Sequence, residues 1–218
     1  LYALVLVSTQ HTQHLLRNYA LVHIIQVMKK LSTYLFLVLF SFQAPSWADD
    51  IRDFQIEGMS VGDSALDFFS EKHILKEFEI GKNEYSWTDQ KFTDVYKYGG
   101  MELYDNLNVA VKRKDKKYII YTVTGQITYD NINDCLEKQK ELENEFTTIL
   151  GDKNKIKHEK KHSQDKTGKS KVYFVIFEFE TMDKIEIACF DLAKHMKQPS
   201  GLDVGIISAE YRNWIQSF

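Results

Sequence analysis

Two histidines and a glutamate are spaced as zinc chemistry requires. Residues 158–162 read HEKKH, so His158 and His162 are four residues apart and Glu159 lies between them. On a helix this spacing places both imidazoles on one face, where they can bind zinc while the glutamate acts on the bound water. A zinc hydrolase that uses His158, Glu159 and His162 is therefore one hypothesis.

The segment around this motif argues against a buried helix. Residues 153–171 contain eight lysines, and Ile156 is their one large aliphatic residue. Such a helix has no apolar side to bury, and neighbouring ammonium groups repel a divalent cation. We predict a solvated lysine-rich loop at 153–171, no cofactor and no metal site, with His158 and His162 as the candidates if a metal binds. This loop, and the second basic tip KRKDKK at 112–117, could contact an anionic surface such as lipid headgroups.

A serine is the second candidate for chemistry. Residues 62–66 read GDSAL, which resembles the nucleophile block of the G-D-S-L esterases, and the resemblance implies Ser64 as the nucleophile. A nucleophile needs a base and an orienting acid. The later G-x-N-D and D-x-x-H blocks of that family do not occur, since Asp191 and His195 are one residue too far apart. The alternative is a glycine turn in which Asp63 or Ser64 caps a helix.

The N-terminal part predicts export. Residues 28–48 begin with Met and two lysines, continue through an apolar stretch at 31–42, and end with small residues before a cleavage site between Ala48 and Asp49. This is the pattern of a signal peptide, and the apolar stretch is shorter than the roughly 20 residues of a membrane span. We expect residues 1–27 to be translated upstream sequence outside the folded protein. The predicted location is periplasmic or secreted.

The mature part, residues 49–218, has the composition of one folded domain. Three of the 28 basic residues and none of the 31 acids precede Asp49, which leaves 25 against 31 and a net charge of −6. A negative charge of this size favours solubility and argues against nucleic acid as a partner. We also predict no membrane span in this part. A chain of this length can bury most of its surface in one core.

Cys135 and Cys189 are the only cysteines of the chain. In an oxidising compartment such a pair tends to join, so we predict a disulfide. Closing a loop of this length would stabilise the fold by about 4 kcal/mol. The alternative is two buried free thiols.

The pattern along 49–218 predicts an α+β fold: an antiparallel sheet with helices packed on one face, in a single domain. The best helix is 131–150, because its apolar residues recur on one face between a possible cap at Asn131 and a stop at Gly151. Strand-like segments are rich in β-branched and aromatic residues and are joined as hairpins rather than by parallel crossovers. They are 51–57, 91–98, two runs within 107–129, 171–180, 184–192 and 202–208; shorter helices are predicted at 64–69, 71–78 and 209–218.

Residues 53–71, DFQIEGMSVGDSALDFFSE, resemble the N-terminal block of small exported proteins of marine bacteria that have no assigned function. The resemblance implies a mature N-terminus near Asp49. The I-x-G-M-S pattern at 56–60 is also similar to that of small envelope proteins with a helix-on-sheet fold, some of which help outer-membrane assembly as lipoproteins. We therefore predict a binding or envelope-accessory module rather than an enzyme. The alternative is a small secreted hydrolase that uses Ser64.

Overall fold

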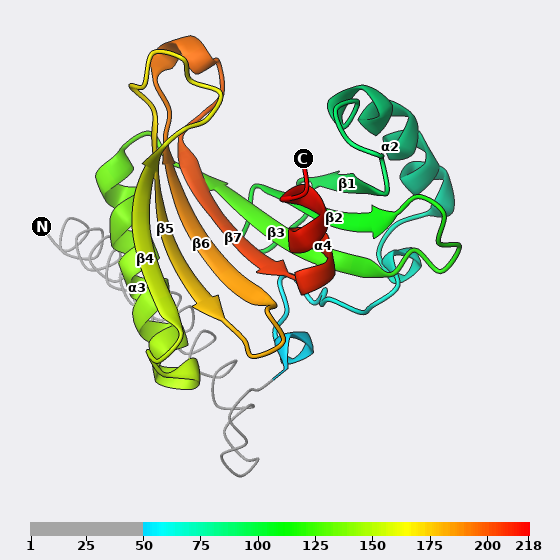
Figure 1. Ribbon diagram of the computed structural model, residues 1–218, viewed down its shortest axis with the longest axis horizontal. Coiled ribbons are helices and arrows are strands. Elements are labelled where there is room, and N and C mark those ends of the chain that lie inside the picture. The colour runs from blue at the N-terminus through cyan, green and yellow to red at the C-terminus, as the bar shows by residue number, and fades with distance from the viewer. Residues whose placement is uncertain (1–49) are drawn as a thin grey trace, which may run out of the picture. The chain divides into compact units, whose positions relative to one another are not determined.

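The computed structural model describes residues 50–218. The predicted leader, the cleavage site at Ala48 and Asp49, and residues 1–27 lie outside the described residues. Within the described part, the chain forms one seven-stranded antiparallel sheet with three α-helices (Figure 1). The predicted α+β class with an antiparallel sheet is therefore confirmed.

The sheet consists of two hairpin groups joined by the last strand. Its order is β1-β2-β3-β7-β6-β5-β4, and every neighbouring pair is antiparallel. The strands are β1 (Phe92–Tyr98), β2 (Asn106–Lys112), β3 (Ile120–Thr128), β4 (Lys155–Lys161), β5 (Lys171–Glu178), β6 (Lys184–Asp191) and β7 (Gly201–Ile207). The sheet is strongly twisted, since β4 to β7 run nearly vertically in Figure 1 whereas β1 and β2 cross the view. Gly201 permits β7 to lie close to β3, because a Cβ atom at this position would be 2.5 Å from Ile127 O.

Two helices cover one face of the sheet. Helix α3 (Ile132–Leu150) begins at Asn131, whose side chain accepts from Asn133 N, and ends at Gly151 with a φ of 72°. Both predicted ends of this helix are confirmed. Helix α2 (Glu71–Glu84) begins at Ser70 and packs against β1. The core beneath both helices is largely aliphatic and includes Ile74, Val95, Val109, Val123, Val175, Ile185, Ile187, Leu202 and Val204.

The predicted disulfide ties α3 to the sheet. Cys135 near the start of α3 is bonded to Cys189 of β6, with their Cα atoms 6.0 Å apart. One turn further along α3, Gln139 donates from Nε2 to the carbonyl oxygens of Tyr173 and Ile187, both at 2.8 Å. A covalent bond, one buried hydrogen bond to β6 and one partly buried hydrogen bond to β5 therefore join this helix to the sheet.

The third helix lies on the opposite face. Helix α4 (Ala209–Ile215) begins at Ser208, whose Oγ accepts from Tyr211 N. Its Trp214 packs on Phe92 at a ring separation of 5.0 Å. Side chains alternate along β1, so Thr93 and Val95 face the core under α2 and α3, and Phe92 faces the opposite side. The prediction that the helices pack on one face of the sheet is therefore correct for α2 and α3. Helix α4 instead covers the opposite face, at the β1–β3 end of the sheet.

The predicted lysine-rich loop at 153–171 is wrong in its first half. Residues Lys155–Lys161 form the edge strand β4, which pairs with all but the last residue of β5. An edge strand is held through backbone hydrogen bonds and needs few apolar side chains, and lysines at an edge oppose pairing with another chain. The predicted strand at 51–57 is also wrong, because this segment forms a short 3-10 helix, η1 (Ile51–Asp53), and an isolated bridge between Ile56 and Met59.

Candidate functional site

The extended backbone of β4 separates the two histidines of the HEKKH motif. Four residues along a strand span about 13 Å, compared with about 6 Å on a helix. His158 stacks on Phe174 with ring centroids 4.7 Å apart, and His162 contacts the edge of Phe190. Within residues 50–218, no group of three histidine, cysteine, aspartate or glutamate side chains is arranged to hold a metal ion. The helical geometry that the zinc hypothesis needs is absent from this segment.

Ser64 lies at the start of a short 3-10 helix, η2 (Ala65–Asp67). Its Oγ donates to Lys117 O at 2.8 Å and accepts from Leu66 N at 3.3 Å. The helix cap that we considered as the alternative for GDSAL is therefore present at Ser64. The predicted helix at 64–69 is reduced to this single 3-10 turn.

Two further histidines, His73 and His195, contact groups other than Ser64. His73 Nε2 lies 2.8 Å from Tyr96 O, and the ring stacks on Phe69. His195 Nε2 lies 2.9 Å from the buried carboxylate of Asp165. Neither imidazole has a described contact with Ser64.

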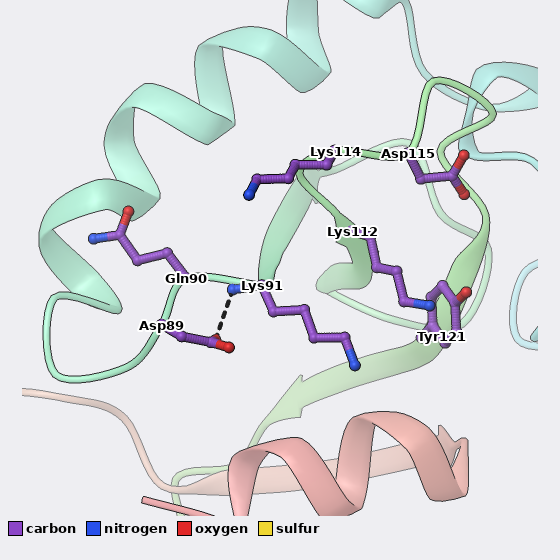
Figure 2. A pocket seen from close by; sticks show the side chains of 7 residues that line it. All are labelled: Asp89, Gln90, Lys91, Lys112, Lys114, Asp115 and Tyr121. Atoms are coloured by element: carbon purple, nitrogen blue, oxygen red, sulfur yellow. Dashed lines mark hydrogen bonds between the residues drawn. The ribbon is translucent and has the colours of Figure 1, made fainter.

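The described surface instead brings lysines together in a cavity beside α4. This lysine pocket has a volume of about 460 Å³ and is lined by Asp89, Gln90, Lys91, Lys112, Lys114, Asp115 and Tyr121. Figure 2 shows Lys114 extending across the pocket toward Gln90, while the ammonium group of Lys112 lies beside the Tyr121 ring. The connection between α2 and β1, the β2–β3 turn and strand β3 therefore each supply part of the wall.

Alternation along the β2–β3 turn decides which basic residues reach the pocket. Lys112 and Lys114 face the α4 side, whereas Arg113 between them points to the α2 side. The guanidinium of Arg113 donates to Thr93 Oγ1 at 2.8 Å and lies over the Phe78 ring. The basic tip KRKDKK is thus divided between the two faces of the sheet.

A carboxylate of α4 joins two of the pocket lysines. Glu210 Oε1 lies 2.8 Å from both Lys91 Nζ and Lys112 Nζ. Partial burial is the largest single influence and disfavours the charged forms of Glu210 and Lys112, but the other contacts together outweigh it. Lys112 and Lys91 lower the pKa of Glu210, and Glu210 and Tyr121 raise the pKa of Lys112. Lys112 Nζ also lies 4.3 Å from the centre of the Tyr121 ring. These contacts bring the ammonium groups of Lys91 and Lys112 to one carboxylate.

The two aspartates of the lining are already engaged by N–H donors. Asp89 Oδ1 accepts from the Trp214 indole at 2.6 Å and from Lys91 N at 3.0 Å. The Trp214 bond is the main cause that lowers the Asp89 pKa, and the amide and ammonium of Lys91 act in the same direction. Asp115 Oδ1 accepts from Lys117 N at 2.9 Å within its own turn. Lys114 forms no ion pair within residues 50–218, although its charge contributes to the lowered pKa of Asp89.

Asp203 lies on the same face of the sheet as α4, outside the lysine pocket, and also has a shifted pKa. Asp203 of β7 is half-buried, and Gln126 Nε2 donates to its Oδ2 at 3.2 Å. Burial raises the pKa of Asp203 to about 6, with a smaller contribution from Glu186, while the Gln126 bond opposes the shift. The carboxylate of Asp203 is therefore held in an unfavourable environment at neutral pH.

The sequence pointed to only part of this pocket. It singled out the tip at 112–117, but not Lys91, Tyr121 or Glu210, because these lie far apart in the chain and only packing brings them together. No family model, curated protein or solved structure matches the chain in comparisons with known proteins. The function must therefore be argued from the geometry of the pocket itself.

Proposed function

We propose that the chain is an exported binding or envelope-accessory module that recognises an anionic group in the lysine pocket. The observation that carries this proposal is that Lys91, Lys112 and Lys114 line one cavity, with the ammonium groups of Lys91 and Lys112 meeting at Glu210. Lysine binds anions as a compact charge with three donors, and a positively lined cleft concentrates them.

The support for export is separate and comes from the cysteines. The disulfide between Cys135 and Cys189 lies in the core, and disulfides persist in oxidising compartments outside the cytosol. Among residues 50–218, no helix is long and apolar enough to cross a bilayer. The disulfide agrees with the signal peptide that the sequence predicts.

Anion titration followed by NMR tests the binding proposal. We expect phosphate, sulfate or acetate, added at constant ionic strength, to shift the backbone amides of Lys91, Lys114 and Asp115 in a saturable way. Lys114→Met should weaken the response. Lys116→Met, which removes the same charge from an exposed position of the same turn outside the pocket lining, should not. If no anion shifts these amides, the pocket is not a binding site and the proposal fails.

Fractionation of the native source, followed by mass spectrometry, tests export. We expect the protein outside the cytosol, with a mature N-terminus at Asp49. A cytosolic protein that retains its leader would contradict the export proposal and leave the anion titration unaffected.

A further inference from the structure

The two edge strands of the sheet, β1 and β4, differ in how they are covered. Helix α2 packs against β1, and its His73 Nε2 lies 2.8 Å from the backbone oxygen of Tyr96 in that strand. At the other edge, every residue of β4 except Lys155 is exposed, and no strand of residues 50–218 lies beyond it (Figure 1). Strand β4 is therefore the more open edge of the sheet.

The pairing of β4 with β5 fixes which of its backbone groups face outward. The register is constant along the whole pair. Just beyond one end of β4, His162 N donates to Ser170 O at 3.0 Å. Just before the other end, Asn154 O accepts from Glu178 N at 3.1 Å. Hydrogen-bonded pairs alternate along an antiparallel ladder, so even-numbered residues of β4 bond to β5 and odd-numbered residues turn their N–H and C=O groups out of the sheet.

Three residues of β4 can therefore pair with an incoming strand. The N–H of the first odd-numbered residue, Lys155, already donates to Asp152 O at 3.2 Å. Lys157, Glu159 and Lys161 follow, and within the described part of the chain no further strand meets their outward groups. A strand added here would form the same antiparallel or parallel ladder that other proteins use to bind extended peptides.

The charge of β4 decides which strand fits. Its sequence, KIKHEKK, holds four lysines and one glutamate. Lys155 and Lys157 share Glu143 of α3, and Lys160 lies over the Phe174 ring. A basic strand, including β4 of a second copy, would bring like charges together, whereas an acidic strand would bring opposite charges together. The lysines that protect this edge from other strands therefore favour an acidic one.

The two faces beside β4 also differ. Odd-numbered side chains lie on the α3 face, as the ion pair of Lys157 with Glu143 shows. Even-numbered side chains lie on the opposite face, where Ile156 is 46 % exposed and His158 stacks on Phe174. Side chains of an added strand alternate in the same way, so acidic residues opposite the odd-numbered lysines go with apolar residues opposite Ile156 and His158.

We propose that the β4 edge binds an extended segment of another protein in which acidic and apolar residues alternate, and that this segment adds to the sheet as a strand beside β4. The binding surface consists of the outward backbone groups of Lys157, Glu159 and Lys161 and the side chains of β4. It is separate from the lysine pocket, which lies at the β1–β3 end of the sheet.

Hydrogen exchange followed by NMR on the whole chain tests strand addition. The probe is a capped peptide of the same length as β4 in which glutamate and valine alternate. In the free protein, the amides of His158 and Lys160 should exchange slowly and those of Lys157, Glu159 and Lys161 quickly. Saturating peptide at low salt should slow exchange of the second set. A peptide with lysine in place of glutamate should leave it unchanged.

Glu159→Pro and its matched control Glu159→Gln separate backbone pairing from charge. Both remove the same negative charge, which favours an acidic peptide, but only proline removes the outward N–H. Proline is tolerated at an edge position whose N–H faces solvent. Glu159→Pro should bind about tenfold more weakly than Glu159→Gln, the loss of about one hydrogen bond. Unchanged exchange in β5 and β6 checks that the sheet is retained.

A peptide methylated at its backbone amides repeats this test on the unchanged protein, since it keeps its charges but cannot donate to β4. If it binds as tightly as its parent, or if Glu159→Pro binds as tightly as Glu159→Gln, binding uses charge alone and strand addition is overturned. Equal protection by the lysine peptide would show that the edge does not select acidic strands. Dimerisation that Glu159→Pro abolishes would make a second copy the occupant and overturn the proposal. If no peptide binds, the proposal fails and the anion titration of the lysine pocket is unaffected.

Discussion

The α3 side and the α4 side of the sheet hold their helices with different side chains. Under α3 the contacts are mostly aliphatic, with one ring contact between Phe146 and Phe177, and are reinforced by the disulfide between Cys135 and Cys189. Under α4 they are aromatic, with Trp214 packed on Phe92, and charged groups surround the rings.

Under the proposed function, this difference separates the side of the sheet that stabilises the fold from the side that binds a ligand. Aliphatic burial is non-directional and excludes water, so the α3 side contributes most to folding. The α4 side keeps ammonium groups at the surface and fixes their positions through Glu210 and Tyr121. We expect substitutions on the first side to change unfolding of the whole domain, and those on the second to change local order and ligand binding.

The largest effect should come from the disulfide. Cys135→Ala with Cys189→Ala should lower the free energy of unfolding by about 4 kcal/mol, because a bond across 54 residues restricts the unfolded chain. Urea unfolding followed by circular dichroism measures this loss. Reductant should destabilise the wild type and leave the double variant unchanged. Equal urea midpoints for the oxidised and reduced wild type would contradict the prediction.

Removal of the α4 anchor should have the next largest effect. Trp214→Ala deletes a buried aromatic ring and its bond to Asp89, which should cost about 3 kcal/mol. Hydrogen exchange should show lost protection in α4 and retained protection in α3. Trp214→Phe keeps most of the packing and should cost about 1 kcal/mol. Equal loss of protection in α3 would show that the two sides are not separable.

Asp203 predicts a pH dependence on the α4 side. Because its pKa is raised to about 6 in the folded state, above about 3.9 in the unfolded chain, this group lowers stability as the pH rises from about 4 through 6. Allowing for partial exposure, the loss is on the order of 2 kcal/mol. Asp203→Asn should therefore be more stable than the wild type at pH 8 and similar at pH 4.

Urea titrations at both pH values check this sign, with the exposed Asp130→Asn as the matched control. The control should unfold like the wild type at each pH. A stability difference between wild type and Asp203→Asn that does not vary with pH would rule out the raised pKa as its cause.

Ser64 should have the smallest effect. Ser64→Ala removes a helix cap and the bond to Lys117 O, which should cost about 1 kcal/mol. Short acyl ester assays should show the same background turnover for the wild type, Ser64→Ala and the exposed control Ser86→Ala. Turnover that depends on Ser64 would support the hydrolase hypothesis over the binding module.

Sequence patterns predicted the structure correctly where burial and helix capping depend on residues that are close together in the chain. The helix at 131–150 was predictable because its apolar face, Asn131 and Gly151 all act locally. They failed for β4, because its pairing with β5 uses backbone groups that every residue possesses. They also failed for HEKKH, since the same letters bring two histidines together on a helix and separate them on a strand.

The sequence by itself determined the antiparallel α+β class, the long helix and the pairing of the two cysteines, because periodicity, caps and the cysteine count carry these features locally. Only the tertiary structure decided that α4 crosses to the second face and that Glu210 bridges Lys91 and Lys112. The physical reason is distance along the chain. Lys91 and Lys112 lie 119 and 98 positions before Glu210 in the chain. They share its carboxylate only after the sheet has brought the ends of β1, β2 and β7 together.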